Sequence, residues 1–187
     1  MMTDLPGPVL WQRLDLPGHD AAMVEALEGG AAIEGMAVFA DGEPTALAYR
    51  VVCDDAWRTL SADVRGRRGA RRLELAIRRS SDGTWTLNGK PCPAVAGCVD
   101  VDLNFSPCTN LLPLRRLDLG VGAAAEVRAA WLQWPEARLL PLRQTYRRRA
   151  ADELEYTADV PGEPFAAVLR APPRGWVLEY GGLWRAL

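Results

Sequence analysis

The stretch GCVDVDLNFSPCTNLLPLRR, residues 97–116, is the most informative part of the sequence for predicting the fold. Over residues 99–106, valine, leucine or phenylalanine alternates with aspartate, asparagine or serine without a break. A period of two predicts a strand with one apolar and one polar face. The polar face carries Asp100 and Asp102, and Arg115 and Arg116 follow soon after.

The same alternation recurs along the chain. Residues 45–52 (TALAYRVV) and 71–79 (RRLELAIRR) each place apolar side chains on one face. Turn signals such as Asp41-Gly42 and Asn88-Gly89 separate the alternating segments, as in hairpins. This pattern predicts an all-β fold, mainly antiparallel, with at most one or two short helices.

Two segments contain good helix formers and are less clear. Residues 123–134 alternate apolar and other residues up to Pro135, which favours a strand. Residues 19–31 are interrupted at Gly29-Gly30, so we expect a short helix or an irregular strand there.

Length and composition place the chain in a broad class. With 187 residues, 49% of them hydrophobic, it is long enough for one domain over residues 1–187 with a core of its own. The N-terminus shows no secretory signal and no apolar run approaches about 18 residues, so we expect a cytoplasmic protein with no integral membrane segment.

Cysteine and histidine usage argues against a metal or cofactor. The four cysteines form no C-x-x-C pair and His19 is the only histidine, so we expect no metal site. No phosphate-binding loop or dinucleotide fingerprint occurs, and no cofactor is expected. The cysteines are interpreted as reduced, small apolar residues.

Asp100 and Asp102 lie two positions apart on the expected strand. Their carboxylates can approach to about 5–7 Å, a separation that glycoside hydrolases use for their two catalytic acids. The alternative is a solvated strand face, or acids paired with arginines of a neighbouring strand.

Arginines concentrate at two places. Residues 64–72 (VRGRRGARR) contain five, which can bind phosphates or an anionic lipid headgroup, or form an exposed hairpin whose charges protect a sheet edge from aggregation. The run has no interleaved aromatic residue, so we expect no nucleic-acid binding. If residues 109–117 form a strand, either face buries Arg115 or Arg116, and Asp100 and Asp102 are the expected partners.

Seven tryptophans in 187 residues are unusual. With four tyrosines they can line an amphipathic cavity or fill the core of a sheet that has few helices to cover it. The sequence leaves both interpretations open.

The chain resembles a bacterial family described as putative glycolipid-binding. The resemblance runs from Trp11 to Trp184 and is most specific in GCVDVDL and in SPCTNLLPLRRL, where Leu111 and Leu114 depart mildly from the family pattern. It implies a single curved sheet that forms a β-roll or open barrel, similar in outline to lipid-carrying half-barrels. It also implies site residues at the motif positions Trp57, Arg58, Asn88, Asp100, Asp102, Thr109, Asn110, Arg115, Arg116, Tyr146 and Tyr156.

Three functions remain open at this point. The first is non-catalytic binding of a glycolipid or fatty-acyl ligand in a cavity of the roll. The second is a carbohydrate-active hydrolase that uses Asp100 and Asp102. The third is a structural homo-oligomer that associates through exposed sheet edges.

Overall fold

A computed structural model describes residues 4–187. The strands are β1 (Val9–Arg13), β2 (Gly18–Leu27), β3 (Gly30–Asp41), β4 (Glu43–Asp54), β5 (Thr59–Arg68), β6 (Arg71–Arg79), β7 (Trp85–Leu87), β8 (Lys90–Pro91), β9 (Asp100–Asp102), β10 (Ala124–Gln133), β11 (Arg138–Ala150), β12 (Glu153–Ala158), β13 (Phe165–Arg170), β14 (Glu179–Tyr180) and β15 (Trp184–Ala186). The described part contains one α-helix, α1 (Leu111–Leu117), and the 3₁₀ helices η1 (Pro93–Val95) and η2 (Pro107–Asn110).

All strands belong to one sheet that is not closed. The order is β8-β7-β6-β5-β4-β3-β2-β1-β15-β14-β13-β12-β11-β10-β9, so that the two edges are β8 and β9. Every neighbouring pair is antiparallel except β9 and β10. The first and last strands pair in the middle of the sheet, with Trp11 opposite Ala186. The predicted all-β, mainly antiparallel class is confirmed.

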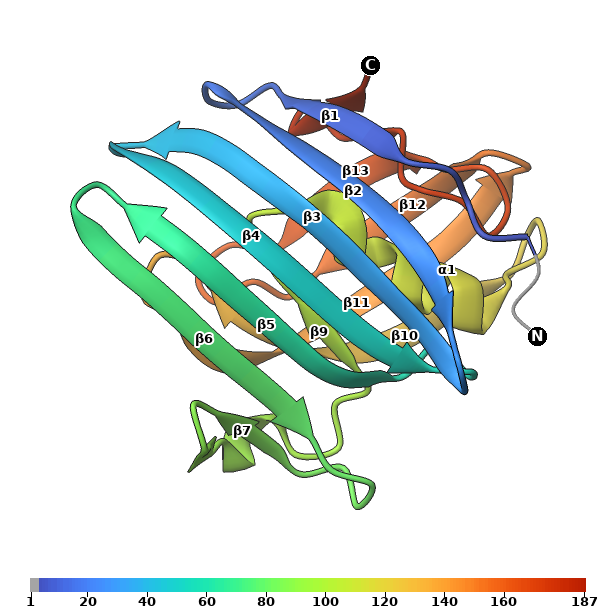
Figure 1. Cartoon of the computed structure of the whole chain (residues 1–187). Coiled ribbons are helices and arrows are strands. Elements are labelled where there is room, and N and C mark those ends of the chain that lie inside the picture. Colours follow the sequence, from blue (N-terminus) through green and yellow to red (C-terminus); the bar gives the residue numbers. More distant parts are fainter. Residues whose placement is uncertain (1–3) are drawn as a thin grey trace.

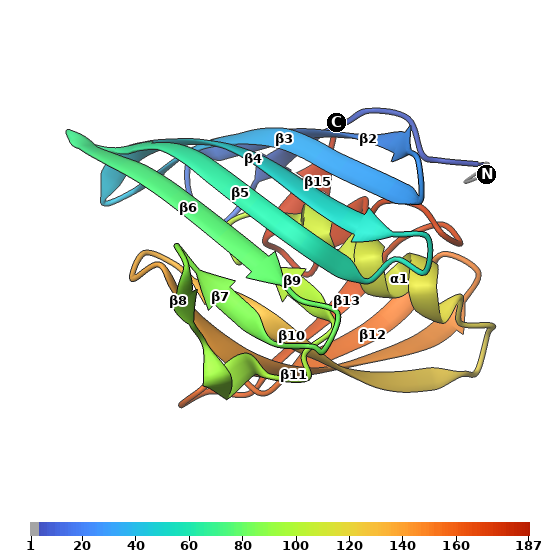
Figure 2. The ribbon, with the colours of Figure 1, turned by 60° about the horizontal axis from the view of Figure 1, so that its bottom comes forward.

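The sheet folds back on itself into two layers. Strands β2 to β6 form one layer and β10 to β13 the other, and the segment that contains α1 lies between them (Figures 1 and 2). The alternation predicted for residues 45–52 and 71–79 is confirmed, since Leu47, Tyr49, Leu75 and Ile77 point into the buried space between the layers.

The central segment departs from the prediction. Only Asp100–Asp102 forms a strand, and residues 107–117 are helical instead of extended. Asp100 is buried together with Val101, Leu103 and Phe105, so residues from both expected faces of this segment lie in the interior. A segment enclosed between two layers is buried on both sides, so its sequence shows neither a clean strand period nor a clean helix period.

Local contacts define both ends of the helical segment. Pro107 opens η2, and the Ser106 hydroxyl accepts a hydrogen bond from the Cys108 amide at 3.1 Å. Pro113 is the third residue of α1, a position whose N–H has no partner inside a helix, so proline costs nothing there. Asp118 ends the helix in the left-handed conformation.

The two segments that contain good helix formers, residues 19–31 and 123–134, lie in regular strands. Residues 18–27 form β2, with a turn at Glu28-Gly29, so neither a short helix nor an irregular strand is present. The strand favoured for residues 123–134 is confirmed as β10. The arginine-rich run 64–72 lies in the β5–β6 hairpin, as the structural interpretation predicted.

The tryptophans mainly fill the core. Six of the seven are buried, and Trp134 is partly buried. Trp11 and Trp176 pack edge to face with ring centroids 5.5 Å apart, and each indole N–H donates to a main-chain carbonyl. Side chains of residues 4–187 therefore largely fill the space between the two layers.

Candidate functional site

A pocket of about 170 Å³ lies between the central segment and the strands of the C-terminal half. Its polar side consists of Asp102, Asn104, Ser106 and Asn110, which all belong to the segment between the layers. The opposite side is made of apolar and aromatic residues of β10 to β15 and of the loops that connect them: Trp131, Leu142, Tyr156, Ala158, Val160, Phe165, Tyr180, Leu183 and Trp184. The pocket therefore presents two chemically different walls.

Hydrogen bonds fix the polar wall. Asp102 accepts from the Asn104 amide at 2.8 Å and from Gln144 Nε2 at 2.7 Å. The same Gln144 nitrogen donates to the Tyr156 hydroxyl at 2.9 Å. Asn110 accepts from the Tyr146 hydroxyl at 2.8 Å. Polar groups anchored in this way keep their orientation when a ligand enters.

The aromatic wall is a packed cluster. The Tyr156 ring lies 5.0 Å from Tyr146, 5.6 Å from Tyr180 and 6.1 Å from Phe165, measured between ring centroids. These rings come from β11, β12, β13 and β14, which are consecutive neighbours in the sheet. Alternation on each strand puts one ring per strand on the inner face, and the sheet register brings them together.

The pocket has an acidic electrostatic character. Asp102 is its one ionisable acid, and no arginine, lysine or histidine lines it. Burial raises the pKa of the Asp102 carboxyl, while the Asn104 amide and Gln144 oppose this shift by hydrogen bonding. The carboxylate can accept hydrogen bonds from ligand hydroxyls, and it disfavours an anionic group next to it.

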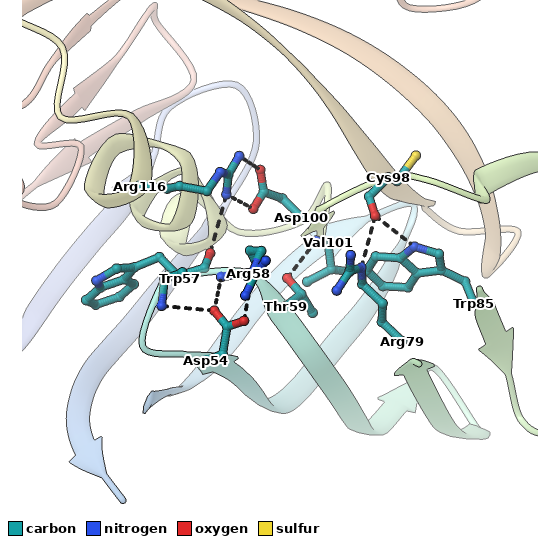
Figure 3. A network of polar contacts seen from close by, with 11 residues as sticks. Asp54, Trp57, Arg58, Thr59, Arg79, Trp85, Cys98, Asp100, Val101 and Arg116 are labelled. Carbon is teal, nitrogen blue, oxygen red and sulfur yellow. Dashed lines mark hydrogen bonds and ion pairs between the residues drawn. The ribbon is translucent and has the colours of Figure 1, made fainter. Parts of the chain in front are cut away.

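Asp100 belongs to a different arrangement. Arg116 donates from both terminal nitrogens to the two Asp100 oxygens, and it also donates to the Trp57 carbonyl at 3.4 Å. Figure 3 shows these groups in one network with Asp54, Arg58 and Thr59. Burial raises the pKa of Asp100, and the Arg116 charge opposes the increase. The expected Asp–Arg pairing is therefore confirmed for Asp100 with Arg116.

Figure 3 also shows what this network joins. Thr59, at the start of β5, accepts a hydrogen bond from the Val101 amide at 3.0 Å. Arg79 and the Trp85 indole, from β6 and β7, both donate to the Cys98 carbonyl at 3.1 Å. These bonds attach the central segment to the N-terminal layer, so the network is a structural anchor for the polar wall.

The predicted pairing of Arg115 with Asp100 or Asp102 is wrong. This buried guanidinium contacts neither aspartate; it donates to the carbonyls of Asp4 and Arg174 at 2.7–2.8 Å. Its carbon Cζ lies 4.7 Å from the centroid of the Trp57 ring. Carbonyl dipoles and an aromatic face replace the carboxylate, which leaves Asp102 free of a cation.

The remaining predicted residues fall into two groups. Asp102, Asn110 and Tyr156 line the pocket, with Tyr146 and the buried Thr109 directly behind it. Outside it, Arg58 binds Asp54 in the β4–β5 turn, and Asn88 accepts from the Ala76 amide in the β7–β8 turn. Trp57, Arg58, Asn88, Arg115 and Arg116 therefore do not reach the pocket.

The two aspartates do not form a hydrolase pair in a shared cleft. Asp100 has an exposed fraction of 2% and both of its oxygens are engaged by Arg116, whereas Asp102 faces the pocket. The arrangement offers one accessible carboxylate, but glycoside hydrolysis of the usual kind needs two that flank the bond.

Sequence reasoning missed part of the pocket. Phe165, Val160 and Leu183 were not singled out, although Phe165 heads the alternating segment FAAVLR that became β13. Trp131, Tyr180 and Trp184 were considered for a cavity only as members of the whole aromatic set. Their meeting point depends on the order of β10 to β15, which no local pattern encodes.

Over residues 4–187 the structure contains no group of three side chains arranged to hold a metal ion. None of its helices in that range has the length and apolar character needed to cross a bilayer.

Comparison with known proteins identifies the family of this chain. A protein-family model with the description "Putative glycolipid-binding" matches residues 8–186. A crystal structure of a DUF1089 family protein from Pseudomonas aeruginosa is 31% identical, with a TM-score of 0.75 over 89% of this chain and 92% of that chain. No protein with a curated description matches. The chain belongs to the DUF1089 family, the family described as putative glycolipid-binding.

Proposed function

We propose that this protein binds an amphipathic ligand, a glycolipid or a fatty-acyl compound, without catalysing a reaction on it. The ligand enters the pocket between the central segment and strands β10 to β15. Its hydroxyl-bearing part contacts Asp102 and Asn110, and its apolar part contacts the aromatic wall.

One observation carries the proposal: the pocket has a polar wall and an aromatic wall facing each other. Sugars have the same two-sided character, because their hydroxyls need hydrogen-bond partners and their C–H faces pack on aromatic rings. The family description, as a binding protein with no stated reaction, supports the same assignment. The absence of a second accessible carboxylate beside Asp102 supports binding over hydrolysis.

The size of the pocket limits what it holds. Sites for drug-sized ligands usually measure about 300–1,000 Å³, and this pocket measures about 170 Å³. It therefore takes one sugar ring or a short part of an acyl chain, and the rest of the ligand extends out of it. We expect short-chain alkyl glycosides to be sufficient probes.

Native mass spectrometry of the protein purified from bacteria, followed by lipid extraction, tests the proposal directly. A ligand-bound mass, or a rise in melting temperature with alkyl glycosides, supports it. Asp102→Asn should weaken the binding of an alkyl glycoside, and Asp55→Asn, on the exposed β4–β5 turn, is the matched control. An apo mass together with no thermal shift across the panel would contradict the proposal.

A further inference from the structure

The outer face of the N-terminal layer is uncovered and partly apolar. In Figure 1 no other element lies in front of β2 to β6 on the side turned to the viewer. Met23, Met36 and Val38 point outward there, with exposed fractions of 47%, 54% and 51%. Small residues, Ala21 and Ala48, flank Met36 on the neighbouring strands. These side chains form a small apolar patch on an open sheet face.

This face is hollowed into a groove. A depression of about 590 Å³ lies over β2 to β5, within the range of small-molecule sites. Its floor includes Ala21, Met23, Met36 and Ala48. Alanines pair with Met36 on both sides, and the short alanine side chains account for the depth between the longer ones. The groove therefore has an apolar floor around Met36.

Arginines stand at the β5 side of the groove. Arg65, which lines it, is opposite Ala48 in the sheet register and pairs with Glu74 in an exposed contact of 3.2 Å. Beyond it, Arg67 and Arg72 form no ion pair with any carboxylate of residues 4–187. The groove thus runs from apolar residues to a region with excess positive charge.

The acids at the groove are already neutralised. Glu34 pairs with Arg50 at 2.5 Å, and Asp63 pairs with Arg78 at 2.7 Å. Arg65 and its neighbours in the hairpin therefore dominate the local field. A solvent-exposed pair such as Arg65–Glu74 contributes little, so Arg65 can exchange its partner for an anionic ligand group at small cost.

We propose that this groove is a second binding site, for a single acyl chain that carries an anionic head, either a carboxylate or a phosphate. The chain lies over Met36 between the alanines, and the head contacts Arg65. The site is separate from the pocket that contains Asp102, which has an acidic wall and no arginine. It does not depend on the function proposed for that pocket.

A single chain fits the charge pattern better than a second copy or a bilayer. Glu34 and Asp63 both border the groove, so a flat partner would cover these two carboxylates together with the apolar floor. Covering paired surface charges costs desolvation energy without a compensating partner. A narrow chain fills the apolar floor and leaves both ion pairs at its margin in water.

Calorimetric titration of the full chain with laurate and with dodecyl phosphate, both kept below their micelle concentrations, tests the proposal. Dodecyltrimethylammonium has the same chain and the opposite charge. We expect both anions to bind one per protein and at least about tenfold tighter than the cation, with weaker binding at higher salt. A preference between laurate and dodecyl phosphate identifies the head as carboxylate or phosphate.

Two variants with matched controls locate the site. Met36→Glu should weaken laurate binding by about tenfold or more, as expected for losing the burial of about two methylenes. Val168→Glu places the same charge on β13, at a valine that is 48% exposed, and should leave binding unchanged. Arg65→Gln should weaken binding by about threefold, and Arg143→Gln, in a similar exposed pair with Glu126, should not.

Several results would overturn the proposal. Equal affinity for the anions and the cation would contradict the role assigned to Arg65. Equal losses of affinity in Met36→Glu and Val168→Glu would show that the chain does not bind in the groove. Binding that begins only above the micelle concentration, or that accompanies dimer formation in light scattering, indicates an assembled surface or a second copy instead. Loss of laurate binding in Asp102→Asn would place the chain in the inner pocket, whereas failure of glycoside binding alone leaves this site intact.

Discussion

Arg116, in the last turn of α1, holds both carboxylate oxygens of Asp100 on β9, across the boundary between the helix and the sheet. Asp100 is almost completely buried and the Arg116 side chain retains 19% exposure. The pair joins β9, which contains Asp102, to α1, which directly follows Asn110, so its integrity affects stability and pocket geometry together.

Removing one partner of this pair should be costly. Arg116→Met leaves a buried carboxylate without a cation, and we expect the free energy of unfolding to fall by about 3 kcal/mol. The double variant Arg116→Met with Asp100→Asn should recover much of this loss, because no unpaired charge remains. Urea denaturation measures both; Arg143→Met, at a mostly exposed arginine, should change stability by less than about 0.5 kcal/mol. A similar loss in the single and the double variant would contradict the interpretation.

Asp20 should make stability depend on pH. It is fully buried on β2, where the hydroxyls of Tyr49 and Ser106 donate to it. Burial raises its pKa from 3.8 to about 6, although these hydrogen bonds act in the opposite direction. Between about pH 4 and pH 6 the folded state therefore holds a proton that the unfolded chain has released, and stability falls as the pH rises through this window.

For a pKa shift of this size, the decrease in the free energy of unfolding due to Asp20 is on the order of 3 kcal/mol. Asp20→Asn should remove this part of the pH dependence while Asp55→Asn, at an exposed position, should keep it. Denaturation midpoints at about pH 4.5 and pH 7 provide the measurement. The same change in stability between these two pH values in the wild type and in Asp20→Asn would show that Asp20 does not have a raised pKa.

Gly35 should tolerate no side chain. It lies opposite Tyr49 in the β3–β4 register, and a Cβ atom there would overlap the Tyr49 hydroxyl and approach the Ala21 carbonyl to 2.5 Å. Gly35→Ala must displace the Tyr49 ring from Asp20, which should lower the free energy of unfolding by about 1–3 kcal/mol. Gly120→Ala meets no atom within 4 Å and should have little effect. Equal stability of the two variants in thermal denaturation would refute this prediction.

The four thiols should react at different rates. Cys53, Cys98 and Cys108 are buried and burial raises the pKa of each thiol, that of Cys53 to about 12. Cys92 is partly exposed, next to the 3₁₀ helix η1. Under native conditions we expect one fast-reacting thiol with a chromogenic disulfide reagent, and Cys92→Ala should remove it. Modification of the buried thiols at the same rate as Cys92 would show that the interior opens readily.

The sequence was most informative where a strand has one buried and one exposed face. The β4 and β6 segments alternate for this reason, and their inward residues Leu47 and Ile77 could be predicted. Helix α1 could not, because it lies between the two layers and is buried almost all round, so LLPLRRL shows no amphipathic period. Pro113 also argued against a helix, although the first turn accepts it.

The pocket could be predicted only in part. The TN and DVD motifs supplied Asn110 and Asp102, and Tyr156 followed from the family pattern. The opposite wall depends on which strands become neighbours after the sheet folds back, so Phe165 and Leu183 carry no local signal. Arg115 shows a further limit, since a buried guanidinium can be satisfied by carbonyl oxygens and an aromatic ring as well as by a carboxylate.

The pairing of β1 with β15 determines the order in which the sheet can assemble during translation. Of the strands in this sheet, β1 leaves the ribosome first, and its partner β15, Trp184–Ala186, leaves last. Until then the hairpins of β1 to β6 leave one side of the β1 backbone as an unpaired edge. The nascent chain must therefore keep this edge from pairing with other polypeptides until the distant strand arrives to occupy it.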